Sequence, residues 1–293
     1  SVRLGGAVVL KLLRRVTPGV HPEAEMTRVL TERGFANIPP LMGEVRRERR
    51  DGPPETLMIA QGFAYNQGDG WAWTLDHLHL RLDDALSRDN GGQGLDLEAY
   101  LNFAQGLGQR LAELHAVLAQ PTDDPAFAPE TMDAAAAEAW AREIAARLDA
   151  AFAALGRRED WADPQEAEAA RAVIEARQAL ERRVEALCAA AEGAPRTRIH
   201  GDLHLGQILV TGSDVMFIDF EGEPARPLAA RRAKASPMRD LAGVLRSLDY
   251  AAAKALQTAP PEAQVDRLAA DLLAPFPVLA AEAVVTSYVD AGG

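Results

Sequence analysis

Three oxygen-bearing side chains, Asp202, Gln207 and Asp219, stand beside two short apolar runs in the C-terminal half of the 293-residue chain. The runs cover residues 208–210 and 215–218, and a glycine-containing turn separates them. This pattern predicts a β-hairpin. Because a hairpin brings its open ends together, we expect the three side chains to converge on one place.

Phosphoryl transfer needs this set of groups. A carboxylate orients the acceptor hydroxyl and accepts its proton, while oxygen ligands hold Mg²⁺ against the ATP phosphates. Protein kinases use His-Arg-Asp, an Asn five residues after the Asp, and Asp-Phe-Gly on the next strand. Here the order is His200-Gly201-Asp202, then Gln207, then Asp219-Phe220-Glu221. A lone His-Gly-Asp would more often be a loop with a capping Asp, but the whole set in register favours a kinase.

Longer motifs extend this likeness to a family. The His-Gly-Asp form resembles the aminoglycoside phosphotransferase branch of kinase-like enzymes, and residues 219–228, 231–234 and 236–250 resemble bacterial maltokinases. That family makes α-maltose 1-phosphate from maltose and ATP and is often fused to trehalose synthase. The resemblance implies a maltokinase of glycogen and trehalose metabolism, with maltose as acceptor and trehalose synthase as a fused or associated partner.

The resemblance also implies an α+β, protein-kinase-like bilobal fold. A small antiparallel β lobe would cover residues 1–65 and bind the nucleotide, and a large helical lobe would cover residues 66–293. The chain starts at Ser1 rather than Met, and such enzymes carry an N-terminal cap and further strands. We therefore expect a fragment with an incomplete small lobe, weak ATP binding and little activity on its own.

Within that fold the resemblance assigns roles at the catalytic end. Asp202 would accept the proton, Gln207 and Asp219 would coordinate Mg²⁺, and Glu221 is a possible further ligand. His200, His204, Arg239 and Asp240 are possible acceptor-binding or supporting residues. For Asp240 the expected contact is a hydrogen bond to the backbone of the catalytic loop.

Lys11 lies in the apolar run 7–13, where a lysine alone would suggest an edge strand. A helix is predicted to follow, with Pro22 at its first position and Gly34 as its stop. The resemblance implies that Lys11 contacts the α- and β-phosphates of ATP and that Glu25 forms an ion pair with Lys11. Glu23 competes for that role, and on the plainer interpretation both are acids at a helix start.

Two strands are expected around residues 41–46 and 57–64. The second leads into Gly62, Phe63 and Ala64, where kinase-like folds place the hinge between lobes and bind adenine through backbone groups. Backbone contacts leave no side-chain signature, so this assignment comes from the resemblance alone.

Five cations follow the catalytic motif in an acidic protein, and two interpretations of them are equally favoured. They either balance nearby carboxylates on a solvated loop or line the phosphate and acceptor site. The five are Arg226, Arg231, Arg232, Lys234 and Arg239.

The remaining pattern is helical. A long helix over residues 97–118 should carry His115 as a hydrogen-bonded core residue and Gly108 at a close helix approach. Two Ala-rich helices, 131–155 and 164–192, should form an inserted hairpin. Their predicted buried stripes are Ile144, Leu148, Phe152, Val173, Leu180, Val184 and Leu187.

Composition narrows the partners and the compartment. The net charge of −12 argues against nucleic acid or an anionic membrane surface. Uninterrupted apolar runs of 18 residues do not occur, so we predict no transmembrane helix. The single Cys188 excludes an internal disulfide, as expected in the cytoplasm, and a buried inert thiol is its favoured state.

Three other functions stay open at this stage. A glucosamine kinase would share the His-Gly-Asp core. At the later motif, residues 219–224, we expect such an enzyme to have Asp-Phe-Asp-Gly-Asn-Pro, whereas this chain has Asp-Phe-Glu-Gly-Glu-Pro. An aminoglycoside or choline-type kinase would use a cationic acceptor. A non-catalytic nucleotide-binding module of a larger polypeptide is the third.

Overall fold

The computed structural model describes residues 1–87, 94–161, 163–259 and 268–293. The chain divides into two compact units, Ser1–Pro129 with Thr197–Gly293 and Glu130–Arg196. Each unit is described by itself below. The boundary at residue 65 between a small and a large lobe stays a prediction.

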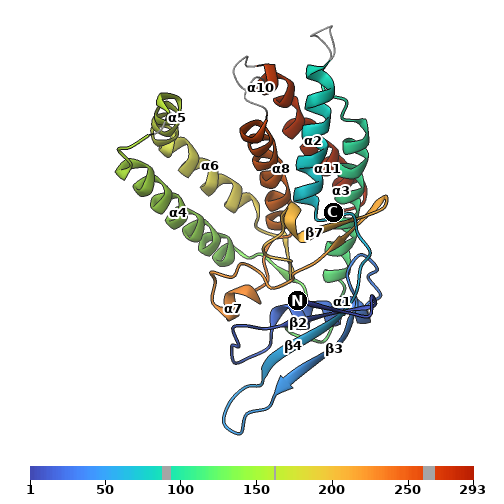
Figure 1. The fold of residues 1–293 in the computed structure, drawn as a ribbon. Coiled ribbons are helices and arrows are strands. Elements are labelled where there is room, and N and C mark those ends of the chain that lie inside the picture. Colours follow the sequence, from blue (N-terminus) through green and yellow to red (C-terminus); the bar gives the residue numbers. More distant parts are fainter. Residues whose placement is uncertain (88–93, 162, 260–267) are drawn as a thin grey trace. The chain divides into compact units, whose positions relative to one another are not determined.

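The first unit begins with a four-stranded antiparallel sheet in the order β1-β2-β4-β3 (Figure 1). Its strands are β1 (Val2–Leu4), β2 (Val8–Leu12), β3 (Leu41–Arg47) and β4 (Glu55–Gly62), and helix α1 (Pro22–Glu32) follows β2 in the chain. Lys11 on β2 lies opposite Ile59 on β4. Met26 and Leu30 on α1 are buried, as their helical spacing predicts. The predicted strands and helix are confirmed to within a few residues.

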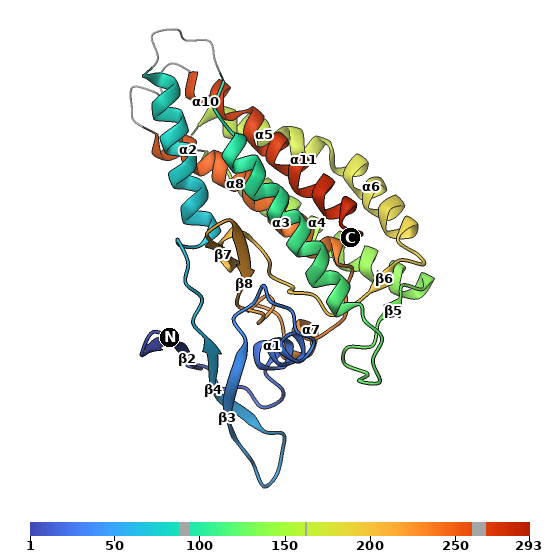
Figure 2. The same ribbon diagram turned by 90° about the vertical axis from the view of Figure 1, so that its right-hand side faces the viewer.

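Most of the rest of this unit is helical. The helices are α2 (Gly70–Leu86), α3 (Glu98–Leu118), α7 (Leu228–Arg231), α8 (Met238–Thr258), α10 (Leu268–Leu273) and α11 (Pro275–Asp290). Figure 2 shows α2, α3, α8 and α11 running alongside one another. A Cβ at Gly108 on α3 would lie 2.2 Å from the Val284 carbonyl oxygen on α11, so glycine permits the close approach that was predicted. His115 is buried and its Nδ1 hydrogen-bonds the Tyr288 hydroxyl at 2.8 Å, also as predicted.

The second unit contains α4 (Ala134–Arg157), α5 (Pro164–Glu175), α6 (Arg177–Ala190) and the short strands β5 (Glu130–Thr131) and β6 (Pro195–Arg196). One helix was predicted where α5 and α6 stand, but it is interrupted at Ala176, where the sequence has neither Gly nor Pro. Phe152 and Cys188 are buried as expected. Val173 and Leu187 are 43% and 60% exposed, so that part of the predicted stripe is wrong, because paired helices cover only one narrow face of each other.

The prediction of no membrane-spanning helix needs a correction. The stretch Leu268–Asp290, 23 residues over α10 and α11, is long and apolar enough to cross a membrane by length and composition. The sequence search for an uninterrupted apolar run missed it because polar residues are scattered through it. Core helices of soluble proteins pass the same test, so one such stretch is weak evidence of a membrane protein.

Candidate active site

The predicted hairpin is present and places Gln207 and Asp219 at the same end. Strands β7 (Ile208–Thr211) and β8 (Asp214–Phe217) pair antiparallel, with Ile208 opposite Phe217. One step further out, the Ile218 N–H donates to the Gln207 carbonyl at 3.0 Å. The chain therefore leaves the hairpin on both sides at Gln207 and Asp219.

Asp219 has an unusual backbone. Its φ of 63° is in the left-handed region. Among the described residues, all others with a positive φ are glycines. Such a conformation costs an L-residue energy and is often found at functional sites. It turns the chain sharply, since the Glu221 N–H donates to the Asp219 carbonyl at 2.7 Å. The strain is a local sign that this position serves function rather than stability.

The loop that carries Asp202 is held in place by a buried aspartate. Asp240 on α8 accepts hydrogen bonds from the backbone N–H groups of His200 at 2.7 Å and Gly201 at 2.8 Å. This is the contact expected from the sequence. Burial acts to raise the pKa of Asp240, but hydrogen bonds from His115 and the Gly201 N–H and electrostatic interactions with His115 and His200 outweigh it and leave that pKa below its ordinary value. Asp240 is therefore an anion that fixes the loop.

His200 fixes the same loop to the hairpin. Its Nε2 lies 2.7 Å from the Ile218 carbonyl oxygen, which can only accept, so Nε2 carries the hydrogen and donates. Burial lowers the pKa of His200. Because a neutral His200 joins the loop to the last residue before Asp219, Asp202 and Asp219 are held on one framework.

The predicted partner of Lys11 needs a correction. The Lys11 ammonium contacts the carboxylates of Glu23 and Asp219, and not that of Glu25. Two residues along a helix turn the side chain by roughly 200°, so Glu23 and Glu25 face nearly opposite directions. Burial acts to lower the pKa of Lys11, but Glu23 and Asp219 outweigh it and leave that pKa above its ordinary value.

Glu25 binds two arginines instead. Arg198 Nη1 lies 2.7 Å from Glu25 Oε2, and Arg232 reaches the same carboxylate at 2.9 Å through Nε and 2.5 Å through Nη2. Arg198 is only 1% exposed. The sequence analysis did not single out Arg198, although its place two residues before His200 was an available signal.

The cations that follow the hairpin mostly balance carboxylates. Arg231 lies 3.7 Å from Glu221, and Arg226 and Arg239 lie 2.7 Å and 3.3 Å from Glu223. The plainer of the two sequence interpretations therefore fits the geometry. Because Glu221 faces Arg231, its role as a further metal ligand stays a prediction.

His204, proposed from sequence as an acceptor or supporting residue, has a local contact. Its Nδ1 accepts a hydrogen bond from the Gly206 N–H at 3.1 Å at the start of the 3₁₀ turn η1 (Leu205–Gln207). This contact shapes the turn that presents Gln207. A role toward the acceptor stays a prediction.

The exit from β4 fits the hinge prediction only in part. The Gly62 N–H donates to the Pro40 carbonyl at 2.9 Å, and the Phe63 N–H donates to the Ala7 carbonyl at 2.8 Å. These two N–H groups are therefore bonded within the protein, and adenine contacts by other backbone groups of Gly62 and Phe63 stay a prediction. An adenine contact by Ala64 stays a prediction.

The donor set suits Mg²⁺ held together with a nucleotide. In the part of the chain that the structure describes, no three His, Cys, Asp or Glu side chains gather closely enough to hold a metal ion. The predicted ligands are one amide, Gln207, and one carboxylate, Asp219, and Mg²⁺ commonly takes its other ligands from phosphates and water. The contact with the Lys11 ammonium shows that Asp219 accepts a cationic partner.

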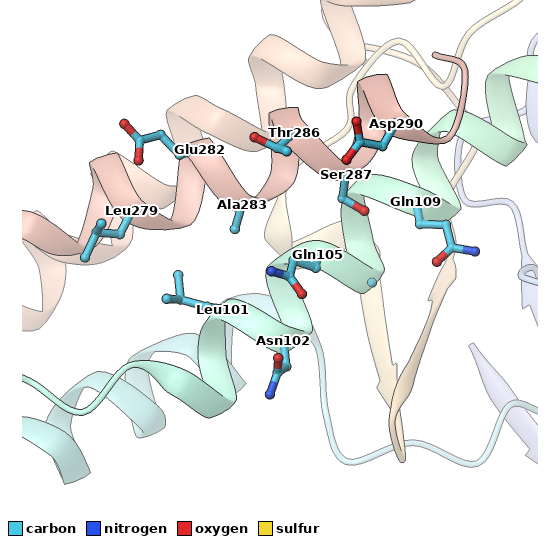
Figure 3. Close-up of a pocket in the computed structure, with 11 residues that line it drawn as sticks. Leu101, Asn102, Gln105, Gln109, Leu279, Glu282, Ala283, Thr286, Ser287 and Asp290 are labelled. Atoms are coloured by element: carbon cyan, nitrogen blue, oxygen red, sulfur yellow. The ribbon is translucent and has the colours of Figure 1, made fainter.

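An open groove of about 690 Å³ lies elsewhere, between α3 and α11 (Figure 3). Its polar lining includes Asn102, Gln105, Glu282, Thr286 and Asp290. None of its lining residues comes from the catalytic loop or the hairpin, so we do not place the phosphoryl acceptor there.

Taken together, a small antiparallel sheet, a Lys–Glu pair and a loop anchored beside a strained aspartate define a kinase-like phosphotransferase. The chain belongs to the phosphotransferase enzyme family, whose model matches residues 2–222. The predicted fold class and the general prediction of a phosphotransferase are confirmed at this level.

Two curated relatives are named glucosamine kinase. That of Mycolicibacterium smegmatis (strain ATCC 700084 / mc(2)155) is 30% identical over 273 residues, which cover 92% of this chain and 62% of the relative. That of Streptacidiphilus jiangxiensis is 30% identical over 261 residues, which cover 85% of this chain and 52% of the relative. This chain thus spans between half and two thirds of the length of these relatives.

A solved structure described as a glucosamine kinase in complex with glucosamine, ADP and inorganic phosphate has a TM-score of 0.77. It is 24% identical, and the match covers 99% of this chain and 62% of that one. Another glucosamine kinase structure, crystal form B, has the same TM-score at 23% identity, covering 98% of this chain and 63% of that chain. At this identity the likeness shows the fold.

These relatives overturn the maltokinase prediction, with maltose as acceptor and trehalose synthase as partner. The preference for maltose over glucosamine depended on Glu221 and Glu223 in place of Asp and Asn. In the structure these two acids pair with arginines of the following segment. Local charge balance accounts for both acids, so their presence does not require maltose as the acceptor.

Proposed function

We propose that the protein transfers the γ-phosphate of ATP to a hydroxyl of an amino sugar of the glucosamine type. The observation that carries the proposal is the shared framework of the catalytic end, where Asp240 and His200 tie the Asp202 loop to the hairpin beside Asp219. The 30% identity to two glucosamine kinases supports the choice of acceptor.

In the proposed reaction Asp202 orients the acceptor hydroxyl and accepts its proton while the phosphoryl group transfers in line. Lys11, held by Glu23, would contact the α- and β-phosphates after leaving Asp219. Gln207 and Asp219 would hold Mg²⁺, which neutralises charge on the phosphates when bound. We expect the protein to work in the cytoplasm, where ATP is supplied.

The test is product identification with the protein in its full natural length, ATP, Mg²⁺ and a panel of acceptors. Glucosamine, N-acetylglucosamine and glucose share most hydroxyl groups and differ in the amine. We expect phosphorylated glucosamine as the main product and much slower transfer to the other two. Equal transfer to all three would contradict the proposed preference for an amino sugar, although the protein would still be a sugar kinase.

The Asp202→Asn variant tests the catalytic assignment in the same assay. Removal of a positioned base should lower turnover by about 10²–10⁴. Because Asp202 is partly exposed, we expect an unchanged unfolding midpoint. Full turnover in this variant would remove Asp202 from the mechanism.

A further inference from the structure

We propose that Glu25 is a positioning residue. From the opposite side of α1, it fixes the direction in which Glu23 presents its carboxylate to Lys11. The Glu25 carboxylate and the guanidinium groups of Arg198 and Arg232 form what we call the Glu25 clasp. The clasp joins α1 to the segment that enters the catalytic loop and to the segment that leaves the hairpin. This inference deepens the proposed function and rests on it for its effect on nucleotide binding.

The Arg198 arm of the clasp is buried. Its guanidinium lies 4.8 Å from the centre of the Phe127 ring and bonds Glu25 at 2.7 Å. A buried ion pair of this kind is costly to break on one side, because the remaining charge has no water to solvate it. Arg198 is two residues before His200, so this arm connects α1 to the catalytic loop.

The Arg232 arm is more accessible and more directional. Its side chain is 30% exposed, and it grips both oxygens of Glu25 through two different nitrogens. Such a two-pronged contact fixes orientation as well as distance, which a lysine cannot reproduce. Arg232 lies between Asp219 and Asp240 along the chain, so this arm connects α1 to the segment after the hairpin.

The two arms are themselves joined by backbone. Thr197 and Ala235 exchange hydrogen bonds of 3.0 Å and 2.9 Å, each N–H donating to the other carbonyl. Arg198 and Arg232 therefore project from adjoining segments toward the same carboxylate. Glu25 thus contacts a preformed support rather than two independent side chains.

The consequence for the nucleotide site follows from helix geometry. Glu23 and Glu25 are in the first turn of α1, and a helix turns as a rigid body. Holding Glu25 against the two arginines fixes the rotation of α1, and with it the direction in which Glu23 presents its carboxylate to Lys11. Loosening the clasp should therefore weaken the contact between Glu23 and Lys11, although no residue of the clasp contacts Lys11.

The principal test uses Arg232→Gln, since Arg198 remains on Glu25 and the fold is preserved. We expect the affinity for ATP, measured by titration, to fall about tenfold, within the usual coupling between residues that share contacts. Arg232→Lys should recover only part of this loss. Full recovery by lysine would reduce the clasp to charge balance and overturn the proposal.

A double-mutant cycle shows whether Arg232 acts through Lys11. In a Lys11→Met background, Arg232→Gln should lower the affinity for ATP by less than twofold. Equal losses in both backgrounds would contradict the proposal. Arg142→Gln is the matched control, because Arg142 is an exposed arginine with one glutamate partner on α4, and it should change neither measurement.

Hydrogen exchange in the nucleotide-free protein separates this inference from the proposed function. Backbone amides of residues 22–32 should exchange faster in Arg232→Gln and not in Arg142→Gln. Unchanged exchange in α1 would overturn the clasp whether or not the protein binds ATP. Faster exchange with no ATP binding by the parent protein would keep the clasp and refute the kinase.

Discussion

Two three-membered ion clusters lie on opposite sides of α1 and have opposite compositions. Around Lys11, one cation stands between two carboxylates, Glu23 and Asp219. Around Glu25, one carboxylate stands between two arginines, Arg198 and Arg232. The first cluster therefore carries one excess negative charge and the second one excess positive charge.

Exposure separates the two clusters further. The Asp219 side chain is 39% exposed, whereas the Arg198 side chain is 1% exposed. A partly exposed carboxylate such as Asp219 can exchange its contact with Lys11 for a metal ion and phosphates, while the buried Arg198 is stabilised only by its protein partners. The comparison teaches that two acids close together on one helix, Glu23 and Glu25, can have different roles. We propose ligand binding for the cluster of Glu23 and structural support for that of Glu25.

A large expected effect on stability concerns the buried Arg198. Arg198→Met should lower the free energy of unfolding by about 3 kcal/mol, because Glu25 loses its fully buried partner but keeps Arg232. Chemical denaturation monitored by tryptophan fluorescence measures the loss. A loss below about 1 kcal/mol would mean that the buried cluster is no more structural than a surface pair.

The acidic cluster should affect the use of ATP as well as stability. Lys11→Met should lower kcat/KM for ATP by about 10²–10³, as expected for the loss of a phosphate contact. Because the buried Glu23 loses its partner, the unfolding midpoint should fall as well, so the kinetics are measured well below that midpoint. Steady-state kinetics and thermal melting give the two values. A variant that loses stability but keeps kcat/KM would reverse the comparison.

Asp219→Asn tests the excess negative charge itself. The change keeps the shape and one oxygen ligand while removing the charge, so the concentration of Mg²⁺ needed for half-maximal activity should rise about tenfold or more. A magnesium titration at saturating ATP measures it, with Asp249→Asn on α8 as a control distant in sequence. An unchanged magnesium requirement would place the metal elsewhere.

A further prediction concerns the pH dependence of stability through His21, which precedes α1. Burial, together with the charges of Arg231 and Lys11, lowers the pKa of His21 to about 4. A group whose pKa is lower in the folded state binds more protons when unfolded, so stability should be complete above pH 6.5 and fall between pH 6.5 and 4. In His21→Gln the unfolding midpoint should decline less over this range, and an equal decline would contradict the prediction.

Much of the site could be predicted from sequence because it is local. The two short apolar runs before and after Gly212 predicted the hairpin, and hairpin closure placed Gln207 and Asp219 together. This inference needed only the chain's local geometry. The contact of Asp240 with the loop was predicted from the resemblance to kinase-like enzymes.

Other features depended on tertiary packing and could not be predicted. The choice between Glu23 and Glu25 requires the rotation of α1 relative to β2, which sequence spacing does not give. The N–H groups of Gly62 and Phe63 are bonded to carbonyl groups just outside the neighbouring strands, which a side-chain pattern cannot reveal. The acceptor was misjudged because Glu221 and Glu223 were compared with family motifs before their arginine partners were known.

The most direct test of the central claim is transfer of labelled γ-phosphate from ATP to glucosamine by the full-length protein and its Asp202→Asn variant. We expect a phosphorylated amino sugar from the parent and a rate lower by about 10²–10⁴ from the variant. Transfer at the same rate by both proteins, or absence of transfer by a parent that binds ATP, would contradict the account.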